Sequence, residues 1–261
     1  MDNGMKSILT RTVFSVALLA PFTAISAVNI SYGDTNTTSE QQAKTAIDQS
    51  KINELVVQLS DAYFPFNNDL TIQYGGDDGP LYDPQAHVVH IPYAFYTDSL
   101  NYFLNNDYQK KFGKPAKDGA LDTLLHTLLH EAGHAYVADH GIPILGKEED
   151  AVDNFAAVLM LNYVENGADA TISAADMFSF ESEDRPDYYD FAEYIGEHSF
   201  DLQRYFSTLC LVYGSDPENH ATLLDEIEED YREEQKDKCE MTFQQIDMNW
   251  KQVLGIKEDK S

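Results

Sequence analysis

The chain has 261 residues, 43% of them hydrophobic, and a formal net charge of −28 at pH 7. This length is enough to bury a substantial core, in one domain or two small ones. The strong negative charge repels phosphate backbones and anionic lipid surfaces, which argues against nucleic acid or a membrane surface as a partner. The charge is otherwise typical of a highly soluble protein and indicates no function.

The first 27 residues have the layout of a secretory signal peptide. Two cations, Lys6 and Arg11, precede an apolar run that closes at the small residue Ala27. The alternative is a transmembrane anchor, but the apolar run is short for a span and Pro21 interrupts it. We therefore expect residues 1–27 to be cleaved, which leaves a bacterial periplasmic or secreted protein with no stable membrane span.

The sequence contains two cysteines, Cys210 and Cys239, and their number agrees with export. An oxidising compartment would let them form a disulfide, and the alternative is a pair of unrelated buried thiols. Closing a loop of this length stabilises a fold by about 3–4 kcal/mol in the chain-entropy model.

The order of predicted elements favours a mainly helical α+β fold with a small N-terminal β-sheet. Polar residues 28–42 predict a flexible mature N-terminus, and residues 43–261 are expected to form a single domain. Two short strands are predicted beside turn residues, over 70–74 and 87–91. Apolar periodicity predicts helices over 40–63, 121–139, 147–165, 191–213 and 221–239.

The segment 130–134 has the sequence HEAGH and lies inside the predicted helix 121–139. His130 and His134 are one turn apart on one helical face, so both imidazoles can reach a single metal ion. Glu131 is placed to act on a water at that ion, which is the mechanical basis of the H-E-x-x-H pattern. A chance match in a chain of this length arises at roughly the one-per-cent level, and the helical context strengthens the signal.

A catalytic zinc ion takes three protein ligands, so the two histidines leave the site incomplete. After the short loop 141–146, the next predicted helix begins with carboxylates that include Glu148 and Glu149, and Asp153 follows one turn later. The small residue Gly133 would let another element approach this helix closely. An early carboxylate of the second helix is then expected to point at the metal.

This arrangement resembles that of the gluzincins, the thermolysin-like zinc metallopeptidases. The resemblance rests on His130, Glu131 and His134, followed by Glu149 and Asp153 on the next helix. It implies a zincin-like domain with the motif on its active-site helix, Glu149 as the third Zn²⁺ ligand, and Asp153 as the partner that orients His130.

The chain also departs from thermolysin. The spacing between the second histidine and the glutamate is shorter, and the chain is smaller, so the thermolysin substrate cleft is not carried over. Glu148 stays open as a rival ligand, although Val152, four residues later, offers it no acidic partner.

A longer string resembles a family of bacterial metallopeptidases of uncharacterised function, and this resemblance covers most of the mature chain. It runs from the motif through Pro143-Ile144-Leu145-Gly146, Glu148-Glu149-Asp150-Ala151 and Asp153 to Glu197-His198-Ser199, Gln203-Arg204, Cys210 and Tyr213-Gly214.

The expected activity is hydrolysis of a peptide or protein substrate by a metal-activated water, with Glu131 as general base. The oxyanion would be stabilised by His198, or by a tyrosine such as Tyr136 or Tyr189. A purely structural role fits His198 equally well, and His126 is interpreted as structural.

The predicted strand 87–91 is expected at the edge of the cleft, where an extended peptide would pair with it. Two alternatives stay open. One is an exported metal-binding or protein-binding module that retains the site without turnover, although the intact Glu131 argues against it. The other is a structural helical protein with a chance motif. Neither the substrate nor the oligomeric state follows from the sequence.

Overall fold

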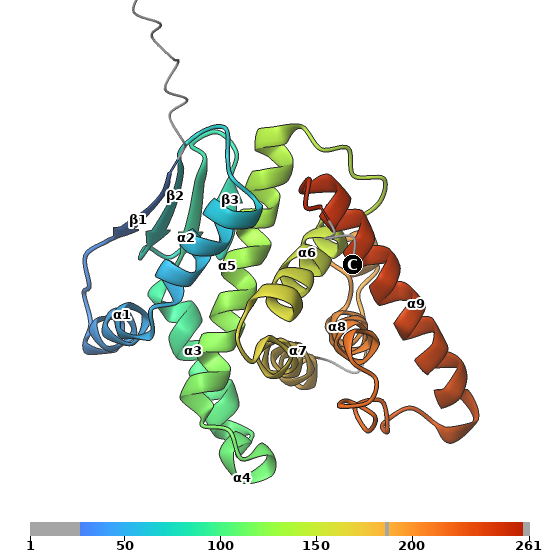
Figure 1. Cartoon of the computed structure of the whole chain (residues 1–261). Helices are drawn as coiled ribbons and strands as arrows, with labels where there is room; N and C mark the ends of the chain where they lie inside the picture. The colour runs from blue at the N-terminus through green and yellow to red at the C-terminus, as the bar shows by residue number, and fades with distance from the viewer. Residues whose placement is uncertain (1–26, 186–187, 258–261) are drawn as a thin grey trace, which may run out of the picture.

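The computed structural model describes residues 27–185 and 188–257, so all but the last residue of the expected signal peptide lies outside the described residues. A four-stranded sheet lies at one side of a larger set of helices (Figure 1), which confirms the predicted α+β, mainly helical class. Among the helices that the structure describes, none combines the length and the apolar character that crossing a bilayer requires.

The sheet has the order β1-β2-β4-β3. Neighbouring strands run parallel from β1 to β4, whereas β3 is antiparallel to β4 and forms an edge. Strand 87–91 was expected at the edge of the cleft with an extended peptide paired to it. The pairing is wrong, because β4 already has β2 on one side and the three-residue β3 on the other. The strands are β1 (Val28–Tyr32), β2 (Leu70–Tyr74), β3 (Leu81–Asp83) and β4 (Val88–Ile91).

The N-terminal segment is not the flexible stretch that was expected over 28–42. Its first residues form β1, and its last ones begin a helix. Val28, Ile30 and Tyr32 alternate with polar residues, and all three belong to the core or pack against it. This period of two is the signal of a half-buried strand, and the polar composition of the segment concealed it.

Nine helices and one 3-10 turn are found among the described residues. The helices are α1 (Thr38–Ser50), α2 (Ile52–Tyr63), α3 (Tyr93–Asn105), α4 (Tyr108–Phe112), α5 (Ala116–His140), α6 (Glu148–Tyr163), α7 (Gly167–Glu183), α8 (Asp201–Ser215) and α9 (Glu229–Val253), and the 3-10 turn is Glu193–Ile195.

Three predicted helices differ from the observed ones. The helix predicted over 40–63 is broken at Lys51, whose φ of 63° is left-handed, into α1 and α2. The helix predicted over 191–213 is continuous only from Asp201, after a loop that contains Gly196. The charged helix predicted over 221–239 begins at Glu229 and extends to Val253.

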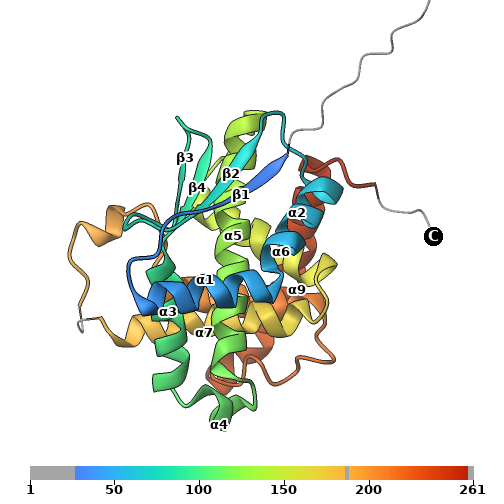
Figure 2. The same cartoon turned by 90° about the vertical axis from the view of Figure 1, so that its left-hand side faces the viewer.

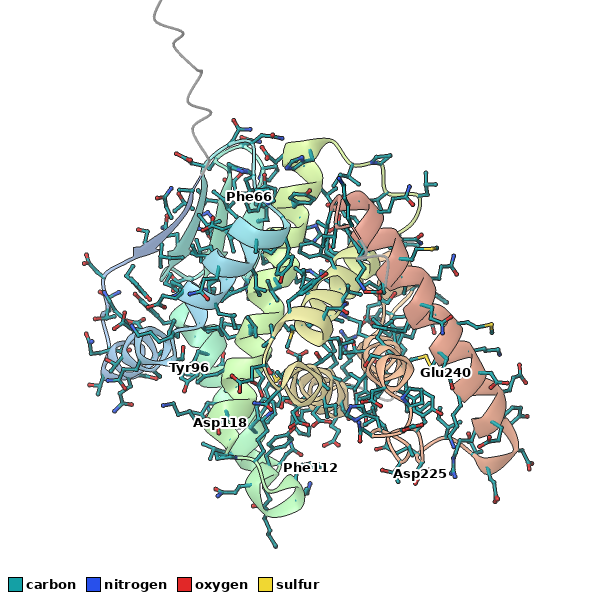
Figure 3. The ribbon with its side chains drawn as sticks, in the orientation of Figure 1. Phe66, Tyr96, Phe112, Asp118, Asp225 and Glu240 are labelled. Atoms are coloured by element: carbon teal, nitrogen blue, oxygen red, sulfur yellow. A yellow bond between two sulfur atoms is a disulfide. The ribbon has the colours of Figure 1, made fainter. Side chains whose placement is uncertain are left out.

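Helix α5 lies at the centre of the molecule (Figures 1 and 2), with the sheet, α3, α6 and α7 packed against it. Its apolar residues face every side, and Leu124, Leu128 and Ala132 are among those buried. Phe66 joins the sheet to this helix, because its ring contacts both Tyr136 of α5 and His87 beside β4 (Figure 3).

Gly133 sets the distance between α5 and α6. A Cβ atom built on it would lie 3.0 Å from Phe155 Cδ1 and 3.1 Å from Val152 Cβ, and both of these side chains are fully buried in α6. A methyl group at this position would require Val152 and Phe155 to shift by a few tenths of an ångström within a close-packed core, so glycine at residue 133 favours the close approach of the two helices.

The last two helices are joined by a disulfide. Cys210 of α8 and Cys239 of α9 are bonded, with their Cα atoms 4.8 Å apart (Figure 3). The bond closes a loop across a sequence separation of 29, and the predicted pairing is thereby present in the fold. Gly214 lies close to the carbonyl of Cys239, so α8 and α9 also pack tightly beyond the bond.

Replacing Gly133 by alanine is expected to destabilise the protein. The added methyl overlaps Val152 and Phe155, and overpacking of this kind costs about 1–3 kcal/mol. Urea unfolding measures the loss. Gly146→Ala is the matched control, since nothing lies within 4 Å of that Cβ position and its φ is not left-handed. Equal stability of the two variants would contradict the close packing described here.

Replacing both Cys210 and Cys239 by alanine is expected to lower the free energy of unfolding by about 3–4 kcal/mol, because the unfolded chain loses its cross-link. Urea unfolding of the double variant is compared with that of the native protein with and without a reductant. The reduced native protein separates the effect of the bond from that of the lost sulfur atoms. Unchanged stability on reduction would show that the bond contributes nothing.

Candidate metal centre

Two helices bring the motif histidines to one carboxylate oxygen. His130 and His134 lie on the same face of α5, and α6 places Glu149 in its first turn. The Oε2 atom of Glu149 lies 3.1 Å from Nε2 of His130 and 3.2 Å from Nε2 of His134. The loop between the helices is short enough to hold them side by side, as the sequence predicted.

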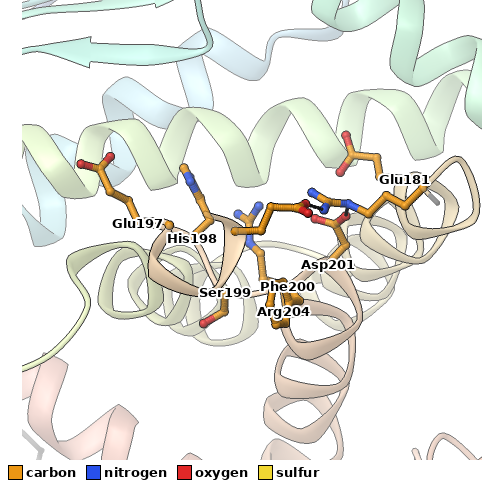
Figure 4. Close-up of a pocket in the computed structure, with 10 residues that line it drawn as sticks. Glu181, Glu197, His198, Ser199, Phe200, Asp201 and Arg204 are labelled. Atoms are coloured by element: carbon orange, nitrogen blue, oxygen red, sulfur yellow. Dashed lines mark hydrogen bonds and ion pairs between the residues drawn. The ribbon is translucent and has the colours of Figure 1, made fainter. Parts of the chain in front are cut away.

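A third imidazole reaches the same oxygen from the loop before α8. Nε2 of His198 lies 2.9 Å from Oε2 of Glu149, and Figure 4 shows this side chain pointing toward α5. The ligand atoms of His130, Glu149 and His198 all lie within 4.8 Å of one another, a spacing that can hold a metal ion. Lys147 fixes the position of the loop, since its Nζ donates to the carbonyl of His198 at 3.1 Å.

The ligand atoms that lie within 4.8 Å of one another belong to His130, Glu149 and His198, and His134 adjoins them through the Glu149 oxygen, 3.2 Å from its Nε2. Ligands at about 2.0–2.1 Å from zinc are separated from one another by about 3.3–3.4 Å. The three Nε2···Oε2 distances, 2.9 to 3.2 Å, are slightly shorter than such an edge. The donor set of imidazole nitrogens and one carboxylate oxygen is also the set that zinc prefers.

Behind the first histidine lies a buried ion pair. Nδ1 of His130 is 2.7 Å from Oδ1 of Asp153, which fixes the ring so that Nε2 faces Glu149. The guanidinium of Arg204 donates to both carboxylate oxygens of Asp153, at 2.7 and 2.8 Å. It also stacks on Phe178, with 3.9 Å between Cζ and the ring centroid. Asp153 therefore has no remaining freedom to turn away from the histidine.

Glu148 occupies a different position from Glu149. Its Oε1 lies 2.8 Å from Nδ1 of His134, on the side of the ring opposite the cluster. The two neighbouring glutamates thus approach the same imidazole from opposite sides, and the geometry of Glu148 matches that of Asp153 rather than that of a metal ligand.

The carboxylates around the three imidazoles stabilise positive charge next to the Oε2 atom of Glu149. Burial raises the pKa of the Glu149 carboxyl, but hydrogen bonds from three imidazoles hold it well below its usual range. Burial lowers the pKa of His130, yet its hydrogen bonds to Asp153 and Glu149 raise it to about 9. Excess negative potential at this point is what a cation site requires.

Glu131 lies beside the cluster and is buried. Burial raises the pKa of its carboxyl, and the nearby His130 and His134 only partly offset this effect. Because a carboxylate with a raised pKa accepts a proton more readily, the environment suits a general base.

An open cleft of about 670 Å³ gives access to the cluster. Its lining includes His130, Glu131, His134 and Glu149, together with His198 from the loop. The strand β3 contributes its edge to the opposite wall.

Three other predicted residues lie away from the cluster. Tyr136 is buried among Phe64, Phe155 and other aromatic rings, and Tyr189 stacks on Phe200. Neither tyrosine lines the cleft. The ring of His126 is buried behind His130, with 6.4 Å between the ring centroids.

Two features of the site were missed in the sequence analysis. Arg204 was noted only within a matching string, although a single cation in an apolar helix is a recognisable signal of a buried partner. Tyr82 of β3 lines the cleft, and its strand is too short to show periodicity.

Residues 32–254 match the model of a protein family described as "Putative metallopeptidase". No curated protein and no solved structure was found to match the chain. The family description agrees with a metal ion and a peptide substrate, and the gluzincin assignment stays a prediction. Because the match covers most of the sequence, the chain belongs to this family of metallopeptidases.

Proposed function

We propose that the protein is an exported, zinc-dependent peptidase. The observation that carries this proposal is the convergence of three imidazole nitrogens on one Glu149 oxygen, directly beside the buried carboxylate of Glu131. Metal ligands and a general base thus lie together at the floor of an open cleft.

In this proposal His130, His134 and Glu149 hold the ion, and Asp153 orients His130. All three ligands come from α5 and α6, whose separation is set at Gly133. A zinc ion in this position supplies Lewis-acid catalysis, since it polarises a carbonyl and lowers the pKa of a bound water.

The chain's own residues carry out the proton transfers. Glu131 takes the proton from the attacking water and delivers it to the leaving amine. His198 donates a hydrogen bond to the oxyanion. Its side chain is 54% exposed and comes from a loop, so it can turn from Glu149 toward a substrate more easily than the ligands on the helices.

The substrate is proposed to bind as an extended strand. Among the described strands, β3 has one neighbour, β4, so its other edge has free backbone groups. Leu81 and Tyr82 of β3 line the cleft that contains Glu131. A peptide that pairs with this edge would pass over the base, which is the common mode of β-strand addition.

Export is supported by the disulfide between Cys210 and Cys239, which is compatible with an oxidising compartment outside the cytoplasm. We infer that residues 1–27 act as the signal peptide and that the protein functions in the periplasm or after secretion.

Replacing Glu131 by glutamine is expected to abolish peptide hydrolysis while zinc still binds, because the amide keeps the shape of the base but takes no proton. Zinc is measured by elemental analysis, and turnover by digestion of a peptide library. Hydrolysis at the native rate in this variant would refute the assignment of the base. If the native, zinc-loaded protein digests no peptide in the library, the proposal of a peptidase is refuted.

Replacing His198 by alanine is expected to lower kcat about 10²–10³-fold, the cost of removing one oxyanion donor. Zinc stoichiometry and affinity should change little, because three ligands remain. Competition with a chelator measures the affinity. A large loss of zinc affinity would instead make His198 a fourth ligand and contradict its proposed role.

A further inference from the structure

A second, smaller pocket opens from the metal centre into the interior. It has a volume of about 150 Å³ and shares His130, Glu131 and His198 with the cleft. Its walls come mainly from α3, α5 and α7 and combine apolar with polar side chains, and the guanidinium-bearing Arg204 of α8 also lines it. They include Phe95, Thr123, Thr127, Ala174, Met177 and Phe178.

One polar atom of this inner pocket has no partner. His126 is only 3% exposed, and its Nε2 has no hydrogen-bond partner among the described residues. Burial lowers the pKa of His126 to about 4, so the ring is uncharged near neutral pH. The backbone of Asp153 also accepts a hydrogen bond from the ring. The proton of the uncharged ring therefore lies on its other nitrogen, Nδ1, and Nε2 is left as an acceptor.

The second polar group is the half-buried carboxylate of Glu181 on α7, which lines both the inner pocket and the neighbouring outer cavity. Burial, and next the charge of Asp201, raise the pKa of this carboxyl to about 7. Neither a hydrogen bond nor an ion pair offsets the burial among the residues described, and only the longer-range charges of Arg204 and Arg185 lower the pKa. A half-buried carboxylate without a close partner gains from a cation placed next to it.

The nearby arginines are already paired. Arg204 donates to Asp153, and Arg185 forms ion pairs with Asp201, at 2.6 Å, and with Glu193. Arg185 lines the neighbouring outer cavity, whose wall also includes Glu181 and His198 (Figure 4). The two arginines therefore do not neutralise Glu181, and the region keeps an excess of negative charge.

The size of the inner pocket suits a single side chain. A cavity of about 150 Å³ in another protein holds one benzene molecule, so this space is too small for a folded segment but large enough for one long side chain. An occupant that matches the apolar side chains Phe95, Met177 and Phe178 and the two acceptors has an aliphatic stem with a cationic donor at its end.

We propose that the inner pocket binds a lysine or arginine side chain of the substrate next to the scissile bond, with Glu181 and His126 accepting its hydrogen bonds. This inference rests on the proposed peptidase function, and it names the substrate class of the same site. Glu181 and His126 are specificity-determining residues, whereas Glu131 and the metal carry the chemistry.

The test compares two peptides that differ only in the residue next to the scissile bond, which is lysine in one and acetyl-lysine in the other. The native protein is expected to cleave the lysine peptide with a kcat/KM at least about tenfold higher, the range of a hydrogen bond to a charged group. Glu181→Gln should remove most of this ratio. Glu183→Gln makes the same charge change on the same helix, on an exposed side chain outside the pocket, and should leave the ratio unchanged.

Binding provides a readout that needs no turnover. Calorimetry with the Glu131→Gln protein should show tighter binding of the lysine peptide than of the acetyl-lysine peptide, and adding Glu181→Gln should equalise them. Cleavage without a preference for lysine, or a preference that survives Glu181→Gln, would overturn the inference but not the peptidase. Selective binding without any cleavage by the native protein would overturn the peptidase and leave the pocket assignment standing.

Discussion

The close contact between α5 and α6 is the constraint on which the rest of the site depends. A metal centre tolerates errors of only a few tenths of an ångström between its ligands, and the ligands proposed here are divided between two helices. Gly133 allows α6 to approach until Val152 and Phe155 touch the backbone of α5. The same approach brings Glu149 to the imidazoles of the neighbouring helix, so a packing requirement and a chemical requirement are met by one residue.

A chain of charges extends from this contact into the interior. His130 is hydrogen-bonded to Asp153, and Asp153 accepts hydrogen bonds from Arg204. The guanidinium of Arg204 in turn stacks on the ring of Phe178. Burying such a pair costs desolvation energy, which the two hydrogen bonds from the guanidinium offset. The ion pair orients His130, because an imidazole whose Nδ1 is hydrogen-bonded to Asp153 presents its Nε2 in a fixed direction. The metal centre is therefore supported by α8, an element far from it in the sequence.

The sequence predicted those parts of the site that follow from local periodicity. His130 and His134 need only a helix to share a face, with Glu131 next to the first of them, and Glu149 needs only the next helix packed beside it. The structure brings these residues together, although their roles stay proposals. The fold class and two strands were equally accessible, because turn residues bound β2 and β4 on both sides.

Long-range contacts account for what the sequence did not reveal. The strand β1 is stabilised by pairing with β2, about forty residues later, and its composition resembles that of a loop. The three residues of β3 carry no periodic signal, so the wrong strand was expected at the edge. Arg204 reaches Asp153 only when α8 packs on α6. The separation of the two residues in the sequence does not predict this contact.

The disulfide has a consequence for when the metal centre becomes rigid. Cys210 lies less than two turns along α8 from Arg204, and its partner Cys239 anchors that helix to α9. In a reducing cytoplasm this anchor is missing, so the helix that supports Asp153 is held by packing alone. For the exported peptidase proposed above, oxidation after export would complete the support of the metal site, so the proposed hydrolytic centre would become rigid only after it leaves the cytoplasm.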